Sequence, residues 1–129
     1  MIAKILLLAL IFVESSGNDK AINGEVAGCL QITPVVVKDV NRIAGAKFTL
    51  EDRFDRQKSI EMSQIYLTFY GKVYTKKTGK EPDNEIYARI WNGGPNGWQK
   101  SRTEDFWLKV KSEIEKQQSA GAGEESESN

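Results

Sequence analysis

The residue best suited to chemistry is a single carboxylate, Glu14, which ends an apolar run from Ile5 to Val13. A carboxyl group that apolar neighbours shield from water stays protonated near neutral pH, and a protonated carboxyl can serve as a general acid. The competing interpretation is a solvated glutamate at a helix end, which residue type alone favours because Glu is usually exposed. The first question is therefore which segments surround Glu14.

Composition removes most other catalytic chemistries. The chain of 129 residues has no histidine and one cysteine. Ser-His-Asp and Cys-His catalysis are therefore excluded, together with the usual His-based zinc sites and any internal disulfide. Catalysis here must rest on carboxylates, hydroxyls or amides, and we expect neither a cofactor nor a metal.

Charge gives weak guidance about partners. Basic and acidic residues balance at 18 each, but three of the acids, Glu124, Glu125 and Glu127, lie at the C-terminus. The rest of the chain is mildly basic, which suits an anionic polymer only weakly. We expect no nucleic-acid partner and a monomeric protein.

The pattern predicts a mostly α, multi-helix single domain over residues 1–117 and a disordered acidic tail over residues 118–129. Thr33 and Pro34 are typical of a helix start, although the β-branched residues that follow equally allow a strand. The acidic and basic loop at residues 51–56 is expected to be solvated or ion-paired. Helices are expected at residues 1–14, 34–45, about 60–71, 84–91 and 104–116.

The N-terminal run has two incompatible interpretations. Lys4 followed by apolar residues is typical of a signal peptide, but the run is too short to span a bilayer, which needs about 20 residues. The alternative is a core helix that is apolar nearly all round because it is buried. Small residues first appear at Ser15, Ser16 and Gly17, and cleavage there would discard Glu14, so the core helix is favoured.

Four stretches, in order, resemble the lytic transglycosylases of the SLT, lysozyme-like type. "VESSGN" at residues 13–18 resembles their Glu-Ser motif, and "AGCLQITP" at 27–34 resembles their Gly-Leu-Met-Gln segment. "FDRQKSIEMSQIYL" at 54–67 is similar to the stretch that leads to their Tyr-Leu pair. "YARIWNGGPNG" at 87–97 resembles their Ala-Tyr-Asn-Ala-Gly-Pro segment. Each motif alone is weak, but their order and spacing are specific.

The resemblance implies an α-rich, lysozyme-like fold in which the catalytic glutamate ends a buried helix. It implies that Glu14 protonates the MurNAc–GlcNAc β-1,4 glycosidic oxygen and then deprotonates the C6 hydroxyl, which closes a 1,6-anhydro ring. The substrate acetamido group would replace the second carboxylate of most glycosidases. The partner would be the glycan strands of peptidoglycan, in the periplasm or at the cell wall.

The resemblance also implies roles for residues around Glu14. Trp91 stands where the family has a Tyr whose hydroxyl approaches the acid, and an indole offers only an N–H donor. Asn23 replaces a Ser and Thr33 replaces a Met, so two further contacts are altered. Simpler structural roles, such as capping, turns and core packing, compete at every one of these positions. The implied substrate-binding residues are Ser15, Asn23, Gln31, Thr33, Trp91 and Asn92, with Tyr66 and Gly93 as structural residues near the site.

Two alternative functions remain open. A hydrolytic lysozyme would need a second carboxylate, for which the acids available are Asp19, Glu25, Asp39, Glu51, Asp52 and Asp55. None of these lies in a recognised motif, which favours the transglycosylase. The other alternative is a catalytically weak peptidoglycan-binding or virion structural protein. A phage-encoded or virion-associated origin is preferred, and the export signal stays undecided.

Overall fold

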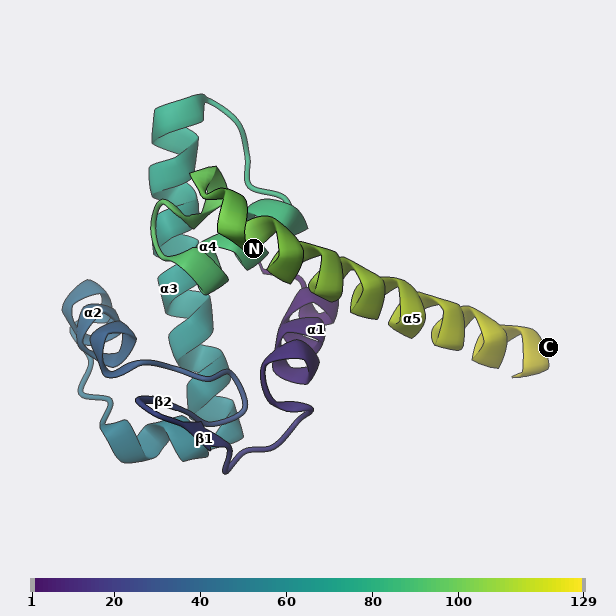
Figure 1. Cartoon of the computed structure of the whole chain (residues 1–129), viewed down its shortest axis with the longest axis horizontal. Coiled ribbons are helices and arrows are strands. Elements are labelled where there is room, and N and C mark those ends of the chain that lie inside the picture. The colour runs from purple at the N-terminus through teal and green to yellow at the C-terminus, as the bar shows by residue number, and fades with distance from the viewer. Residues whose placement is uncertain (1, 129) are drawn as a thin grey trace.

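The computed structural model describes the backbone of residues 2–128 and the side chains of residues 2–120 (Figure 1). The prediction of a mostly α, lysozyme-like single domain is confirmed. The helices are α1 (Lys4–Ser15), α2 (Pro34–Ala44), α3 (Arg56–Thr78), α4 (Asn84–Gly93) and α5 (Glu104–Ser128). A short antiparallel hairpin joins β1 (Ile22–Asn23) to β2 (Val26–Ala27), and 3-10 turns lie at Leu50–Phe54, Gly97–Gln99 and Ser101–Thr103.

Helix α3 is the long central helix, with α2 on one side and α1 on the other in this view (Figure 1). Helix α2 packs on α3, whereas α1 packs on α5, and α4 contacts both α3 and α5. The N-terminal apolar run forms α1 and supplies the core with Leu6, Leu7, Ala9, Leu10 and Ile11. The helix that carries Glu14 is therefore part of the core, as the buried-helix interpretation requires.

Helix α2 begins as its sequence predicts. Thr33 is the N-cap, with its Oγ1 accepting a hydrogen bond of 3.1 Å from the Val36 N–H, and Pro34 occupies the first helical position. The expected end of α3 at Gly71 is wrong, because the helix continues to Thr78 and ends at Gly79 in the left-handed conformation. Gly71 is instead a packing position, since a Cβ there would lie 2.9 Å from Tyr87 Cε1.

The loop at residues 51–56 is more than the solvated or ion-paired segment that was expected. Arg53 is 9% exposed and donates from Nη1 to the backbone oxygens of Glu25 at 2.7 Å and Ile32 at 2.9 Å. Its Nε also donates to the Leu50 oxygen at 2.9 Å. Arg53 therefore ties the turn before α3 to the hairpin and to the start of α2.

The acids of this loop are used as caps. Asp52 Oδ2 accepts from the Thr49 N–H at 2.8 Å and closes a capping box at the 3-10 turn. Asp55 is the N-cap of α3 and accepts from the Lys58 N–H at 2.9 Å. Carboxylates at helix starts satisfy backbone N–H groups that have no partner within the helix.

The C-terminal part of helix α5 extends away from the rest of the molecule (Figure 1). It reaches Ser128, and its side chains beyond Ala120 lie outside the described residues. The predicted disorder of residues 118–129 therefore stays a prediction. Within residues 2–128, no helix is long and apolar enough to cross a bilayer.

The close approach of Gly28 to the Arg53 backbone gives a test of stability. Gly28 has φ +83°, and a Cβ at this position would lie 1.8 Å from the Arg53 backbone oxygen. We expect Gly28→Ala to lower the free energy of unfolding by about 3 kcal/mol or more, since it combines left-handed strain with overpacking. Gly24, with φ +63° and no atom within 4 Å of a built Cβ, is the matched control. Gly24→Ala should cost about 1 kcal/mol, and equal losses in urea unfolding would contradict this account.

Candidate active site

Glu14 is placed by the way α1 ends. The helix stops at Ser15, and Ser16 adopts the left-handed conformation with its N–H donating to the Phe12 oxygen at 2.8 Å. Arg56 then fixes the loop that follows, with Nε donating to Asp19 Oδ1 at 2.8 Å and Nη2 to the Gly17 oxygen. The glutamate therefore sits in the last turn of a core helix, where the chain turns sharply away.

The acid is partly buried against an indole. Trp91 of α4 donates from Nε1 to Glu14 Oε2 at 3.2 Å. The Trp91 ring in turn meets Tyr66 of α3 edge to face, with centroids 5.7 Å apart and an interplanar angle of 87°. Glu14 of α1, Trp91 of α4 and Tyr66 of α3 thus form one continuous set of contacts. The sequence left a contact between Trp91 and the acid in doubt, and the indole N–H supplies it.

Burial changes the protonation of this carboxyl group. It raises the pKa of Glu14 from 4.5 to about 7, and the Trp91 hydrogen bond partly opposes the rise. The cause is loss of hydration of the ionised form, whereas an N–H donor favours that form. A carboxyl group with a pKa near neutrality can give up a proton and take one back at the same pH.

The Ser15 hydroxyl forms hydrogen bonds with backbone groups rather than with the Glu14 carboxyl group. Its hydroxyl donates to the Cys29 oxygen at 2.8 Å and accepts from the Asn18 N–H at 3.1 Å. It therefore joins the end of α1 to the segment after β2. This geometry favours a structural role in holding the loop beside Glu14.

Gln31 and Asn23 form one unit inside the hairpin loop. Gln31 Nε2 donates to the backbone oxygens of Gly28 at 2.9 Å and Ala21 at 3.3 Å. Asn23 Nδ2 donates to Gln31 Oε1 at 2.7 Å, and Gln31 itself has φ 52°. The Gln31 amide is thus engaged within the loop, and Asn23 is exposed.

With this geometry in view, the comparisons identify the family. Residues 1–113 match the family described as the transglycosylase SLT domain. The chain belongs to the SLT transglycosylase family. The resemblance drawn from four motifs is therefore confirmed.

A solved structure supports the same fold. The crystal structure of a lysozyme from Tapes japonica is similar with a TM-score of 0.66 and 26% sequence identity. The similarity covers 84% of this chain and 87% of the lysozyme. No curated protein matches the sequence significantly.

Of the remaining predicted site residues, Thr33 and Gly93 have structural contacts and Asn92 is exposed. Thr33 uses its hydroxyl to cap α2, and Asn92 is exposed in the last turn of α4 beside Trp91. Gly93 is buried, and a Cβ there would lie 2.6 Å from Thr103 Cγ2, so its role is close packing of α4 on the turn before α5. The structure therefore brings together Glu14, Trp91 and Tyr66 and leaves Thr33 in a structural contact.

Most acids considered as a second carboxylate have other partners. Asp19 pairs with Arg56, and Asp39 pairs with Arg42 at 2.7 Å. Asp52 and Asp55 are caps, as described above. Glu25 and Glu51 are exposed, with Glu25 in the tight turn of the hairpin. Glu14 is thus the acid whose environment is suited to proton transfer.

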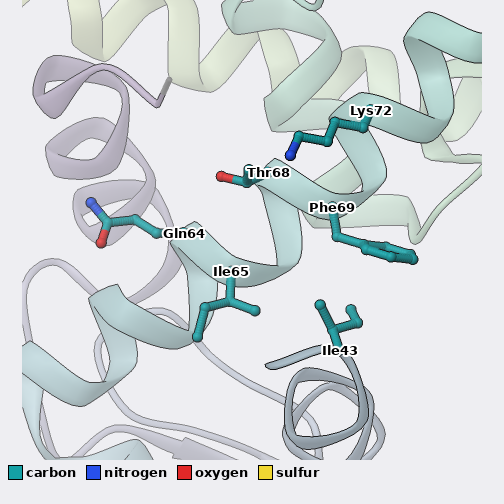
Figure 2. A pocket seen from close by; sticks show the side chains of 6 residues that line it. All are labelled: Ile43, Gln64, Ile65, Thr68, Phe69 and Lys72. Carbon is teal, nitrogen blue, oxygen red and sulfur yellow. The ribbon is translucent and has the colours of Figure 1, made fainter. Parts of the chain in front are cut away.

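A cavity of about 390 Å³ lies between α2 and α3 (Figure 2). Residues of α3 and Ile43 of α2 line it, and its character is mostly apolar. Thr68 and Tyr66 are two positions apart on α3, so they point to opposite sides of that helix. The lining residues are Ile43, Gln64, Ile65, Thr68, Phe69 and Lys72. None of these lining residues is a carboxylate.

The indole contact gives a test of the acid's environment. Trp91→Phe removes the N–H that favours ionised Glu14, so we expect the pKa of Glu14 to rise further above about 7. Carbon-13 NMR titration of the Glu14 carboxyl group would measure it. Trp98→Phe is the control, because Trp98 packs edge-on against Tyr74 at 5.0 Å. If the pKa of Glu14 stays the same or falls in Trp91→Phe, the Trp91 hydrogen bond does not stabilise the ionised carboxyl group.

Burial of Glu14 also predicts a pH-dependent effect on stability. Because the folded pKa of about 7 lies above the unfolded value of 4.5, the native state binds more protons between these limits. Stability is then lost as pH rises from 4.5 to 7. Glu14→Gln removes this loss, so the variant should gain about 3 kcal/mol over the wild type at pH 8.

The gain should be small at pH 4, where the carboxyl group is protonated in both states. Chemical unfolding at pH 4 and pH 8 measures both differences. Glu25→Gln, at an exposed site, is the control for loss of one carboxylate. A gain in Glu14→Gln that is equal at the two pH values would contradict the burial argument.

Proposed function

We propose that this protein is a lytic transglycosylase that cleaves the MurNAc–GlcNAc β-1,4 bond of peptidoglycan with Glu14 as its single catalytic acid and base. Membership of the SLT family supports a peptidoglycan enzyme that cleaves glycosidic bonds. The observation that carries the proposal is the pKa of about 7 at Glu14, beside the Trp91 N–H.

Two proton transfers complete the reaction. Protonated Glu14 gives its proton to the glycosidic oxygen, and the C1–O bond breaks with the electron pair leaving on that oxygen. The acetamido carbonyl of the same sugar stabilises the developing positive charge at C1. Ionised Glu14 then takes the proton of the C6 hydroxyl as O6 bonds to C1, which restores the acid and consumes no water.

The surrounding residues support these steps by position. The Trp91 N–H stabilises the carboxylate that forms after the first transfer. Asn23 and Asn92, both exposed, are the amides we assign to the saccharide, while Gln31, Ser15 and Thr33 hold the loops. We place the activity at the cell wall or in the periplasm, with a phage-encoded or virion-associated origin as a further proposal.

Hydrolysis is the second candidate because the structural neighbour is a lysozyme. In that reaction water, rather than the C6 hydroxyl, would attack C1. Retaining and inverting glycosidases usually employ a second carboxylate for this purpose. Exposed Glu25 is the hairpin acid that a hydrolase would use, which makes it a discriminating position.

Product analysis tests both candidates. Mass spectrometry of muropeptides released from purified sacculi should find 1,6-anhydroMurNAc ends, which are lighter by one water than reducing ends. Glu14→Gln should lower the rate by about 100-fold or more, the usual effect of losing an acid–base group. Glu25→Gln should retain activity. Reducing ends, together with a large loss in Glu25→Gln, would favour the lysozyme instead.

A further inference from the structure

We propose that Lys38 and Arg42 of α2, with Tyr70 of α3, form a second binding element for the glycan strand, which takes the carboxylate groups carried by muramyl units. The inference rests on the proposed function and names which feature of the glycan strand the site recognises. The element is separate from Glu14, because Arg42 and Tyr70 form their hydrogen bonds with Asp39.

A continuous chain of contacts joins this element to the acid. Trp91, which bonds Glu14, meets Tyr66 at 5.7 Å, and Tyr66 meets Tyr70 at 4.8 Å with an interplanar angle of 58°. The Tyr70 hydroxyl then donates to Asp39 Oδ2. Three aromatic rings in succession therefore connect Glu14 to α2. Tyr66 is buried, so only the half-buried rings of Trp91 and Tyr70 are available to stack against a sugar ring.

Asp39 holds the element in place. Arg42 donates from Nε at 3.0 Å and from Nη2 at 2.7 Å to Asp39 Oδ1, while Tyr70 donates to Oδ2. The Asp39 carboxylate thus accepts three hydrogen bonds from two side chains and positions both of them. The hydroxyl of Tyr70 and the guanidinium of Arg42 are thus fixed relative to each other.

Arg42 is exposed, but an ion pair and an aromatic ring fix the position of its guanidinium group. Its side chain is 60% exposed, and its guanidinium carbon lies 5.6 Å from the centroid of the Phe69 ring. The ion pair with Asp39 uses Nε and Nη2. A cation held in position by a carboxylate and an aromatic ring loses less freedom when it binds an anion.

The surface beside this cation is hollow. A depression of about 370 Å³ is lined by Val35, Lys38, Asp39 and Arg42, which follow one face of α2. Val35 is 75% exposed, so the hollow is apolar along one side. Its two cations face a single acid that is already paired. A ligand that is part apolar and carries negative charge fits this surface.

Muramyl units supply that chemistry. A strand of GlcNAc alone is neutral, whereas each MurNAc carries a lactyl group that ends either in a carboxylate or in a peptide with carboxylates of its own. The lactyl methyl group and the alanine side chains of such a peptide suit the apolar side of the hollow. We therefore expect the element to distinguish muramyl-containing strands from neutral chitin-type strands.

The test measures binding without turnover in the full chain carrying Glu14→Gln. Isothermal titration would compare peptide-bearing glycan strands, amidase-treated strands that keep only the lactyl carboxylate, and a neutral GlcNAc hexamer. Lys38→Gln should weaken binding of the carboxylate-bearing strands about threefold, and the double change with Arg42→Gln about tenfold, as for exposed charge pairs. The neutral hexamer should bind equally well to all variants.

Lys109→Gln is the matched control, because Lys109 is an exposed lysine of α5, a helix that packs on α1 and α4. It should leave all three affinities unchanged. An effect confined to peptide-bearing strands assigns the element to the peptide carboxylates, and an equal effect on amidase-treated strands assigns it to the lactyl carboxylate.

Three results would overturn the inference. These are equal losses for the neutral hexamer, no loss in the double variant, or no binding of any strand. The proposed function is judged separately by whether Glu14→Gln abolishes cleavage. If the protein cleaves through Glu14 but binds all strands equally well, the proposed function stands and the binding element does not.

Discussion

The structure depends on one constraint, which is that a carboxyl group must be kept from water while its ionised form keeps a hydrogen-bond donor. Burial alone raises the pKa of Glu14, and the Trp91 N–H limits the rise to a value of about 7. A solvated glutamate at the end of α1 would be ionised at neutral pH and could not donate a proton. A fully buried one without a donor would be protonated and could not take a proton back. This balance requires α1 and α4 to bring Glu14 and Trp91 together, and Tyr66 of α3 packs against the Trp91 ring.

Side chains bonded to backbone oxygens hold the loops around that point. The two-residue strands of the hairpin are too short to be stable by their own ladder. Arg53 binds the carbonyl oxygens of Glu25 and Ile32, and Gln31 binds those of Gly28 and Ala21. Buried polar side chains of this kind specify one loop conformation, because a shifted loop would leave their donors unsatisfied.

The sequence predicts elements whose signals are local. The apolar run of α1 and the Thr33-Pro34 start of α2 lie within single helices, and both predictions hold. The function of Arg53 depends on carbonyl oxygens more than twenty positions away, so its own neighbours, which are mostly charged, suggested a solvated loop. Likewise Gly71 looked like a helix end because glycine often ends helices, whereas here it makes room for Tyr87. Long-range packing decided each of these positions.

The exchange of a tyrosine for Trp91 has a chemical consequence for the site. A phenol can both donate and accept a hydrogen bond, so it can pass a proton on, whereas an indole N–H only donates. At this position the aromatic residue can stabilise the carboxylate but cannot take part in proton transfer. The chain has no histidine that could share the task. Both proton transfers of the proposed reaction must therefore be made by the same carboxyl group, which is why the pKa of Glu14 has to lie near the pH at which the enzyme works.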